Sequence, residues 1–247
     1  PLLTRIVMGL SSFLASWWWA VVLVIAALVL VAARALKDEA LRLRINADVY
    51  YMDFLGYQGT PDVCVDASGN PLQGPPGTRG LCGQYLNLGD AKVKGFELEA
   101  TLRPAEGFLI EGAASYNDFK FKTPNIRTNE IVAGQSRPGI GKFKWSVGAQ
   151  YQAELGDNIG SLTPRVDFAR TPGYCGNFAC AAISKVDAYN LVNARLTFRS
   201  ADRGWSVALV ATILFDKLYY INKIVTSYAG AQPGRPREIA VTLRRNF

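Results

Sequence analysis

The sequence predicts a membrane all-β protein, with about eight antiparallel strands of an outer-membrane type of barrel preceded by one N-terminal transmembrane α-helix. Three observations predict this fold class. Residues 17–33 form a continuous apolar run, most of the remaining 247-residue chain alternates apolar and polar positions, and the connections between the alternating segments are short and long in turn. Continuous runs are typical of spanning helices, whereas alternation is typical of strands with one apolar face.

The apolar run starts with Trp17, Trp18 and Trp19 and has no polar side chain up to residue 33. As a helix it would be about 25 Å long, the short end of what spans a bilayer. Indole rings favour the membrane interface, and the basic residues that cluster after the run place its C-terminal flank in the cytoplasm by the positive-inside rule. A secretory signal peptide cleaved near residues 33–35 and a buried soluble helix are the alternatives.

Alternation starts near residue 41 and predicts half-buried strands. The expected strands are residues 41–54, 90–103, 108–121, 141–154, 159–171, 186–199, 204–216 and 236–247. Most are ten residues or longer, against five or six for an ordinary soluble strand. Alternation alone fits a soluble sandwich as well as a barrel. Strand length and aromatic strand ends such as Tyr151 and Trp205, expected at the membrane interface, favour the membrane.

The connections support the same interpretation. Residues 104–107, 155–158 and 200–203 are short turns, whereas 55–89, 122–140, 172–185 and 217–235 are long loops rich in Gly, Pro and Asn. Short turns on one rim and long loops on the other are typical of outer-membrane barrels. The polar strand faces are expected to line the lumen. Their charged and amide residues are Glu97, Glu99, Arg103, Glu111, Asn117, Lys142, Lys144, Arg165, Asp167, Asn193 and Arg195.

The four cysteines fall into two loop pairs, Cys64 with Cys82 and Cys175 with Cys180. On this strand count both loops face the cell exterior, an oxidising setting, so local disulfides are predicted and free thiols are the alternative. Zinc binding has neither CxxC spacing nor a histidine to support it.

Composition excludes several function classes. The chain contains no histidine, which excludes a serine–histidine–aspartate triad, a histidine-bearing zinc site and a histidine-ligated haem. The net charge of +7 is spread along the chain rather than gathered in a patch, so no nucleic-acid partner is expected. No catalytic residues, cofactor or metal are predicted, and the protein is not expected to be an enzyme.

Several segments of residues 41–247 resemble the C-terminal part of a TonB-dependent receptor barrel. They are residues 214–220 (LFDKLYY), 234–238 (GRPRE) leading into 239–247 (IAVTLRRNF), 87–99 (NLGDAKVKGFELE) and 48–53 (DVYYMD). Two positions depart from the family pattern. Ile213 stands where an asparagine is expected, and Arg245 takes a lipid-facing position that is usually aromatic.

The resemblance implies a function and partners. It implies active uptake of a siderophore, vitamin or glycan across the outer membrane, a lipid bilayer setting, coupling to the TonB system, and assembly by the barrel-assembly machinery, which reads the last strand ending in Phe247. Such receptors have 22 strands, a plug and a TonB box, whereas this sequence predicts about eight strands and neither a plug nor a TonB box. We therefore expect this chain alone not to transport. A self-contained eight-stranded porin or adhesin with an N-terminal export signal is the alternative.

Residues 1–44 resemble something else, the second membrane helix of the type II secretion inner-membrane protein F family, through residues 1–14 (PLLTRIVMGLSSFL) and 34–44 (RALKDEALRLR). That likeness implies an inner-membrane helix, which conflicts with an outer-membrane strand directly after it. We therefore expect a joined sequence with its junction near Leu41–Ala47, dividing the chain into residues 1–44 and 45–247. The alternatives are an export signal and a fragment of a secretion subunit.

Overall fold

The computed structural model describes residues 42–61, 70, 85–125, 131–225 and 229–246. The predicted N-terminal helix with Trp17, Trp18 and Trp19, the pair Cys64 and Cys82, and Phe247 lie outside the described residues. Within the described ranges, no helix has the length and apolar character needed to cross a membrane.

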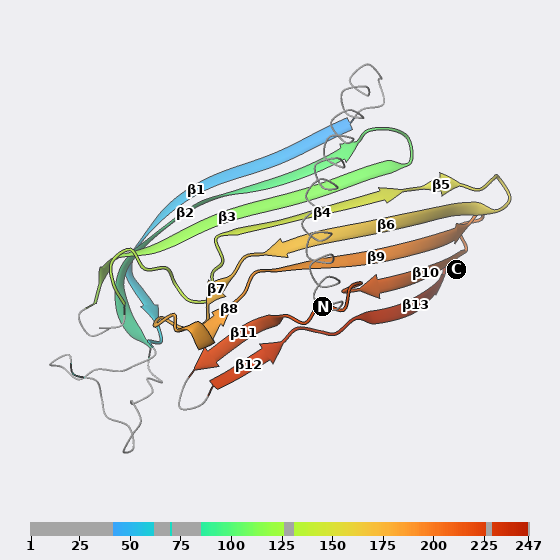
Figure 1. The fold of residues 1–247 in the computed structure, drawn as a ribbon. Coiled ribbons are helices and arrows are strands. Elements are labelled where there is room, and N and C mark those ends of the chain that lie inside the picture. Colours follow the sequence, from blue (N-terminus) through green and yellow to red (C-terminus); the bar gives the residue numbers. More distant parts are fainter. Residues whose placement is uncertain (1–41, 62–69, 71–84, 126–130, 226–228, 247) are drawn as a thin grey trace, which may run out of the picture.

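All eight predicted strands are present and form one antiparallel sheet in chain order, which confirms the predicted β architecture. Figure 1 shows the sheet as a single curved layer with its short turns gathered at one end. A two-residue strand, β5 (Ala153–Glu154), extends the pairing of the fourth strand to the fifth. The eight long strands are β1 (Arg42–Gly59), β2 (Leu86–Arg103), β3 (Phe108–Pro124), β4 (Phe143–Tyr151), β6 (Gly160–Thr171), β9 (Tyr189–Ser200), β10 (Trp205–Thr212) and β13 (Glu238–Arg245).

The sheet is open in the described part of the chain. β1 and β13 are its outermost strands, and they pair only with β2 and β10, not with each other. Most residues of β1 and all residues of β13 are exposed. Each outer strand therefore presents a row of backbone groups suited to pairing with another strand.

Two of the predicted loops contain additional strands. β11 (Tyr220–Val225) pairs with β12 (Ala229–Pro233) in the last loop. β7 (Tyr174–Cys175) pairs with β8 (Lys185–Val186), which follows the 3₁₀ turn η1 (Ala182–Ser184). Residues 172–185 and 217–235 were predicted only as long loops, and the structure adds these short hairpins, in which Gly and Pro mask the alternation that identifies longer strands. β1 and β2 also reach beyond their predicted ends, to Gly59 and Leu86.

The outer face of the sheet is an exposed apolar surface bounded by aromatic residues. At the long-loop end, Phe96 packs on Tyr116 and Phe143, with ring centroids 5.9 and 6.5 Å away. At the short-turn end, Phe108 packs on Tyr151 at 4.4 Å. Phe108 and Tyr116 are eight residues apart on β3, about 27 Å along the strand. At a tilt of about 40° this height is about 21 Å, close to the apolar band of an outer-membrane barrel.

The aromatic strand ends singled out in the sequence lie at the short-turn edge of this surface. Tyr151 and Trp205 are both exposed, and the Arg245 guanidinium lies 4.9 Å from the centroid of the Trp205 ring. The arginine at a position expected to be aromatic is thus accommodated by a cation–π contact with its cross-strand partner. That Tyr151 and Trp205 contact the membrane interface stays a prediction.

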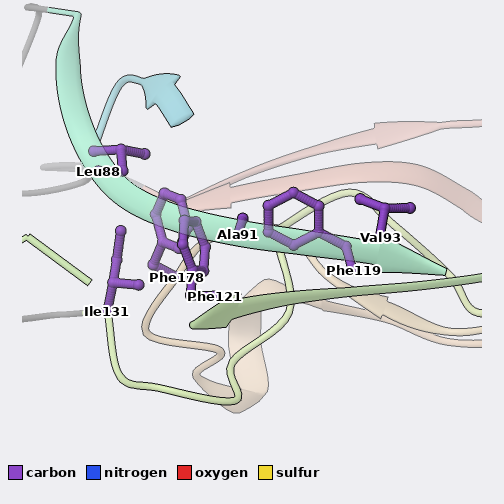
Figure 2. Packing of buried hydrophobic residues seen from close by; sticks show 7 residues of the cluster. All are labelled: Leu88, Ala91, Val93, Phe119, Phe121, Ile131 and Phe178. Carbon is purple, nitrogen blue, oxygen red and sulfur yellow. The ribbon is translucent and has the colours of Figure 1, made fainter. Parts of the chain in front are cut away.

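Beyond the aromatic row at the long-loop end, the apolar side chains move to the opposite, inner face. Phe119 and Phe121 of β3 pack there with Ala91 and Val93 of β2, and the cluster is completed by Leu88, Ile131 and Phe178. Figure 2 shows Ile131 and Phe178 approaching the two strands from separate loops. This cluster is the buried core of the protein, and it anchors the long loops to the sheet.

The short turn between β9 and β10 gives a pH-dependent prediction. The Asp202 carboxylate accepts hydrogen bonds from the Ser200 hydroxyl and the Gly204 backbone N–H, which hold the pKa of this carboxyl below its usual range. A lowered folded-state pKa adds stability above the unfolded pKa of about 3.9, and the gain is lost as pH falls through the folded value. We expect Asp202→Asn to remove this acid sensitivity, measured as amide exchange of Gly204 between about pH 2 and 5. An unchanged pH profile in the variant would contradict the assignment.

Candidate functional site

The inner face of the sheet carries a cluster of charged side chains centred on Arg165 of β6. Its guanidinium donates to both oxygens of Asp167, at 2.7 to 3.0 Å, and Nη1 donates to Glu111 Oε2 at 2.8 Å. The same nitrogen donates to Gln150 Oε1 at 3.1 Å. One cation thereby joins residues of β3, β4 and β6. We call this set of four residues the Arg165 cluster.

Gly148 of β4 makes the Arg165 cluster possible. The pairing register places Gly148 between Glu111 of β3 and Asp167 of β6, so the Arg165 side chain must pass over it to reach Glu111. A Cβ at this position would lie 2.7 Å from Arg165 Nη2 and closer still to Asp167. Glycine is therefore required where the ion pairs cross the strand.

The surroundings of the Arg165 cluster are open and polar. A shallow cavity of about 430 Å³ lies beside it, with Glu99 and Asn193 among its other lining residues. Arg195 of β9 stands directly opposite Arg165, a like-charged pair that is unfavourable by itself. The two carboxylates of the cluster offset this repulsion.

A second inner-face arrangement joins β1, β2 and β3. The ring of Tyr50 lies over Gly95, and a Cβ added to Gly95 would be 2.5 Å from the Tyr50 hydroxyl oxygen. This hydroxyl donates to the Tyr116 carbonyl at 3.3 Å and accepts from Asn117 Nδ2 at 3.1 Å. Gly95, the glycine of the Lys-Gly-Phe-Glu segment, thus leaves room for the Tyr50 side chain, which crosses from β1 over β2 to β3.

The two arrangements define what the inner face can do. It presents paired charges, amides and hydroxyls at a water-accessible surface, which suits hydration and contact with a polar body rather than bond-making chemistry. Among the described residues, no group of three or more acidic or thiol side chains is placed to hold a metal ion.

Sequence reasoning placed Glu111, Asn117, Arg165 and Asp167 on one polar face but did not bring them together. It missed Tyr50, Gly95 and Gly148 as parts of the site. A glycine in the middle of a long strand is the signal that identifies such close approaches.

The structure confirms the predicted local disulfide between Cys175 and Cys180, whose Cα atoms are 5.0 Å apart. The bridge links β7 to the segment before η1. Ser184, the last residue of η1, is fully buried, and its hydroxyl donates to Asn177 Oδ1 at 2.7 Å. The pairing of Cys64 with Cys82 lies outside the described residues and stays a prediction.

Reduction of this bridge should loosen the β7–β8 hairpin and leave the main sheet intact. A loop closed over a sequence separation of five residues restrains the unfolded chain by about 2 kcal/mol at most. We expect Cys175→Ser/Cys180→Ser to increase amide exchange at Gly176 and Ser184 but not at residues 145–150 of β4. Equal loss of protection in both regions would contradict a local role.

The two C-terminal segments that carried the family resemblance meet in space. The Asp216 carboxylate accepts from the Arg237 backbone N–H at 3.3 Å and lies 4.0 Å from its guanidinium. The Gly234 N–H donates to the Tyr219 carbonyl at 2.8 Å, beneath the Tyr219 ring. These contacts fix the position of the β11–β12 hairpin relative to the paired strands β10 and β13.

A long-stranded, all-antiparallel sheet with an apolar outer face and a charged inner face defines the wall of an outer-membrane β-barrel. The family model for the TonB-dependent receptor-like β-barrel matches residues 33–212. The chain therefore belongs to this family, whose members are receptors and transporters rather than enzymes.

Solved structures show the same fold. The ferric yersiniabactin uptake receptor FyuA from Yersinia pestis superposes with a TM-score of 0.64 at 17% identity, over 83% of this chain and 28% of that chain. The ferric-catecholate import receptor Fiu from E. coli K12 gives 0.60 at 18%, over 83% and 25%. The ferripyoverdine receptor of Pseudomonas aeruginosa gives 0.58 at 18%, over 83% and 25%. The chain thus spans about a quarter of the length of these receptors. No curated protein matches the sequence.

Proposed function

We propose that residues 42–246 are C-terminal barrel strands of an outer-membrane receptor for TonB-coupled uptake of a scarce, bulky nutrient. A ferric siderophore is the first choice of substrate, because the receptors with the same fold include a siderophore receptor from Acinetobacter baumannii and receptors for ferric yersiniabactin, ferric catecholates and ferripyoverdine. A vitamin or a glycan remains the second choice. The long loops would face the cell exterior and the short turns the periplasm.

The open sheet carries this proposal. β1 and β13 both lack a second neighbour among the described strands, whereas a closed eight-stranded porin or adhesin requires these two strands to pair. Edges of this length are expected where further barrel strands continue the sheet. The inner face, with the Arg165 cluster, would then be part of a wide lumen wall against a plug or a passing substrate.

Two measurements separate the receptor portion from the closed barrel. The full chain, produced with an export signal, is examined for a heat-modifiable band in outer-membrane fractions. Energy-dependent accumulation of radiolabelled ferric siderophore is then measured in cells that lack their own receptors. A receptor portion gives neither signal alone, whereas a closed small barrel gives a heat-modifiable band. Accumulation that is abolished by a protonophore would contradict the expectation that these strands alone do not transport.

The partners follow from the same proposal. The barrel-assembly machinery would recognise β13 and the terminal aromatic residue Phe247. The complete receptor would contact the TonB system. Cys64 and Cys82 would tie the first long loop in the oxidising exterior.

We propose further that residues 1–44 have a separate origin, an inner-membrane helix joined to the barrel strands near Leu41–Ala47, at least eight residues after the start of the family match at residue 33. The conflict between a cytoplasmic flank and an outer-membrane strand supports this proposal. An unbroken DNA read across the codons for residues 35–50 tests it. Secretion-gene sequence that stops or shifts frame there is the expected result, and one continuous frame in independent reads favours an export signal instead.

A further inference from the structure

A second cavity, of about 310 Å³, lies on the inner face at the short-turn side of the Arg165 cluster, over the neighbouring strands β6 and β9 (Figure 1). Its lining consists only of arginines, hydroxyls and side-chain amides, without a carboxylate or an apolar side chain. Besides two members of the Arg165 cluster, it is lined by Gln152, Ser161, Thr163, Arg195, Thr197 and Arg199. We call it the arginine cavity.

The arginine cavity has more positive charge than its own residues neutralise. Arg165 is paired with both carboxylates of its cluster. Arg195 stands directly opposite Arg165, and its Nε donates to the Thr197 hydroxyl at 3.1 Å. The cross-strand partners of Arg195 and Arg199 on β10 are uncharged. Among the described carboxylates, none lies within ion-pair distance of Arg195 or Arg199.

Two carboxylates stand near the short-turn end of the cavity without neutralising it. Glu154 and Asp157 line the adjoining cavity together with Arg199. The register places Glu154 opposite Ser161, which in turn stands opposite Arg199, so the Cα atoms of Glu154 and Arg199 are about 10 Å apart. The Glu154 carboxylate accepts instead from Gln152 Nε2 at 2.7 Å. The charge of the arginine cavity therefore stays available to an anion.

Ser161 gives an independent indication of a ligand. It is only 8% exposed and lines the cavity, and its hydroxyl has no hydrogen-bond partner among the described residues. A buried hydroxyl without a partner is unfavourable, because it has lost most of its contact with water. Thr163, at the next inner position of β6, presents a second hydroxyl without a partner in the described part of the chain. A ligand rich in hydrogen-bond acceptors would satisfy both.

We propose that the arginine cavity binds a small solute that carries two or more carboxylate or phosphate groups. A guanidinium binds either group through two parallel hydrogen bonds. Arg195 and Arg199 are four residues apart on one strand face, about 13 Å between Cα atoms, so each can hold one anionic group with the Thr197 hydroxyl between them. The volume is that of a small-molecule site. On the proposed function, on which this assignment rests, the cavity faces the lumen and favours anionic nutrients.

Binding is measured by isothermal titration calorimetry of the full chain in zwitterionic detergent micelles, with citrate and pyrophosphate as probes. At least one probe should bind saturably at one site per chain, and the tighter of the two shows whether carboxylates or phosphates are preferred. An arginine hydrogen bond to an anion is worth about tenfold in affinity, so R195Q/R199Q should weaken binding about 100-fold at low salt. Ser161→Ala should weaken it about fivefold, the value of one neutral hydrogen bond.

R42Q/R44Q is the matched control. It removes two exposed arginines from the inner face of β1, four strands or about 19 Å from β6, and should change binding less than about threefold. Each variant is first shown to keep the wild-type β-sheet circular dichroism. If R195Q/R199Q does not fold, R199Q alone should weaken binding about tenfold, because Arg199 is exposed and makes no ion pair among the described residues.

Three results would overturn the proposal: no saturable binding of either probe, equal losses in R195Q/R199Q and R42Q/R44Q, or acetate binding as tightly as citrate. Failure of the anion site is distinguishable from failure of the proposed function. A chain that binds neither probe and gives no heat-modifiable band loses only the anion site. A chain that binds a probe at this cavity and also gives the heat-modifiable band of a closed small barrel keeps the anion site and loses the proposed function.

Discussion

Replacing Gly95 by alanine is expected to destabilise the sheet by about 3 kcal/mol, an overpacking cost combined with a lost hydrogen bond. The new Cβ would clash most closely with the Tyr116 carbonyl oxygen and would also lie 2.5 Å from the Tyr50 hydroxyl oxygen and 2.6 Å from its ring carbon, so both the β3 backbone and the Tyr50 ring must shift. Its bonds to Asn117 and to the Tyr116 carbonyl would break together. The free energy of unfolding, measured by urea titration of the chain in zwitterionic detergent micelles, tests this expectation.

Gly112 of β3 is the matched control. A Cβ at Gly112 would meet only the Ser146 carbonyl oxygen, at 3.7 Å, so Gly112→Ala should change the free energy of unfolding by less than about 0.5 kcal/mol. Tyr50→Phe keeps the ring and should cost about 1 kcal/mol for the lost hydroxyl bonds. Equal effects of the alanine substitutions at Gly95 and Gly112 would show that the change in the free energy of unfolding comes from the lost flexibility of glycine in the strand and not from the clash at Gly95.

The strand order of this fold could be predicted from the sequence because each strand separates two different solvents. Residues 143–151 of β4 place Trp145 and Val147 on the outer face and Ser146 and Gly148 on the inner face, in strict alternation. An apolar phase on one side and an aqueous surface on the other impose this period over the whole strand. The short turns then follow from the gaps between alternating segments.

The same alternation does not reveal where the apolar side changes face. Phe119 and Phe121 alternate with Lys120 in a continuous β3 pattern, yet the two phenylalanines are buried on the inner face. They pack with Ile131 from the loop that directly follows β3 and with Phe178, which is distant in sequence. Contacts between loops decide this reversal, and a periodicity of two carries no information about them.

The break between β10 and β11 also depends on geometry that the residue types hide. Ile213 has a φ of +50°, in the left-handed region that asparagine tolerates and β-branched residues disfavour. The family resemblance pointed to an asparagine at this position, and the structure supplies the physical reason for it. Ile213 is held there by burial and by its N–H, which donates to Asn193 Oδ1 at 2.9 Å.

In the candidate site, the alternation predicts which face each charged residue occupies but not which ion pairs form. Period two placed Arg165, Asp167 and Glu111 on the polar face, since all three occupy inner positions of their strands. Which charge pairs with which depends on the stagger between β3, β4 and β6. The bond from Arg165 to Glu111 also needs the missing side chain of Gly148, which only the register identifies as lying between them.

Arg165→Met is expected to destabilise the sheet by about 2 kcal/mol, because it leaves the Glu111 and Asp167 carboxylates facing each other without their shared cation. The cost stays below that of a fully buried pair because about a quarter of the Arg165 side chain is exposed. The free energy of unfolding at low and high salt measures it, and salt should reduce the difference by screening the two carboxylates.

Arg195→Met is the matched control for Arg165→Met. Arg195 stands opposite Arg165, and its Nε donates to the Thr197 hydroxyl on its own strand, so its loss removes a repulsion and should be neutral or slightly stabilising. Combining Arg165→Met with Glu111→Gln and Asp167→Asn should recover at least half of the lost free energy, because no unpaired charge remains. If the triple variant is no more stable than Arg165→Met, the cost lies in lost packing of the arginine stem over Gly148 rather than in unpaired charge.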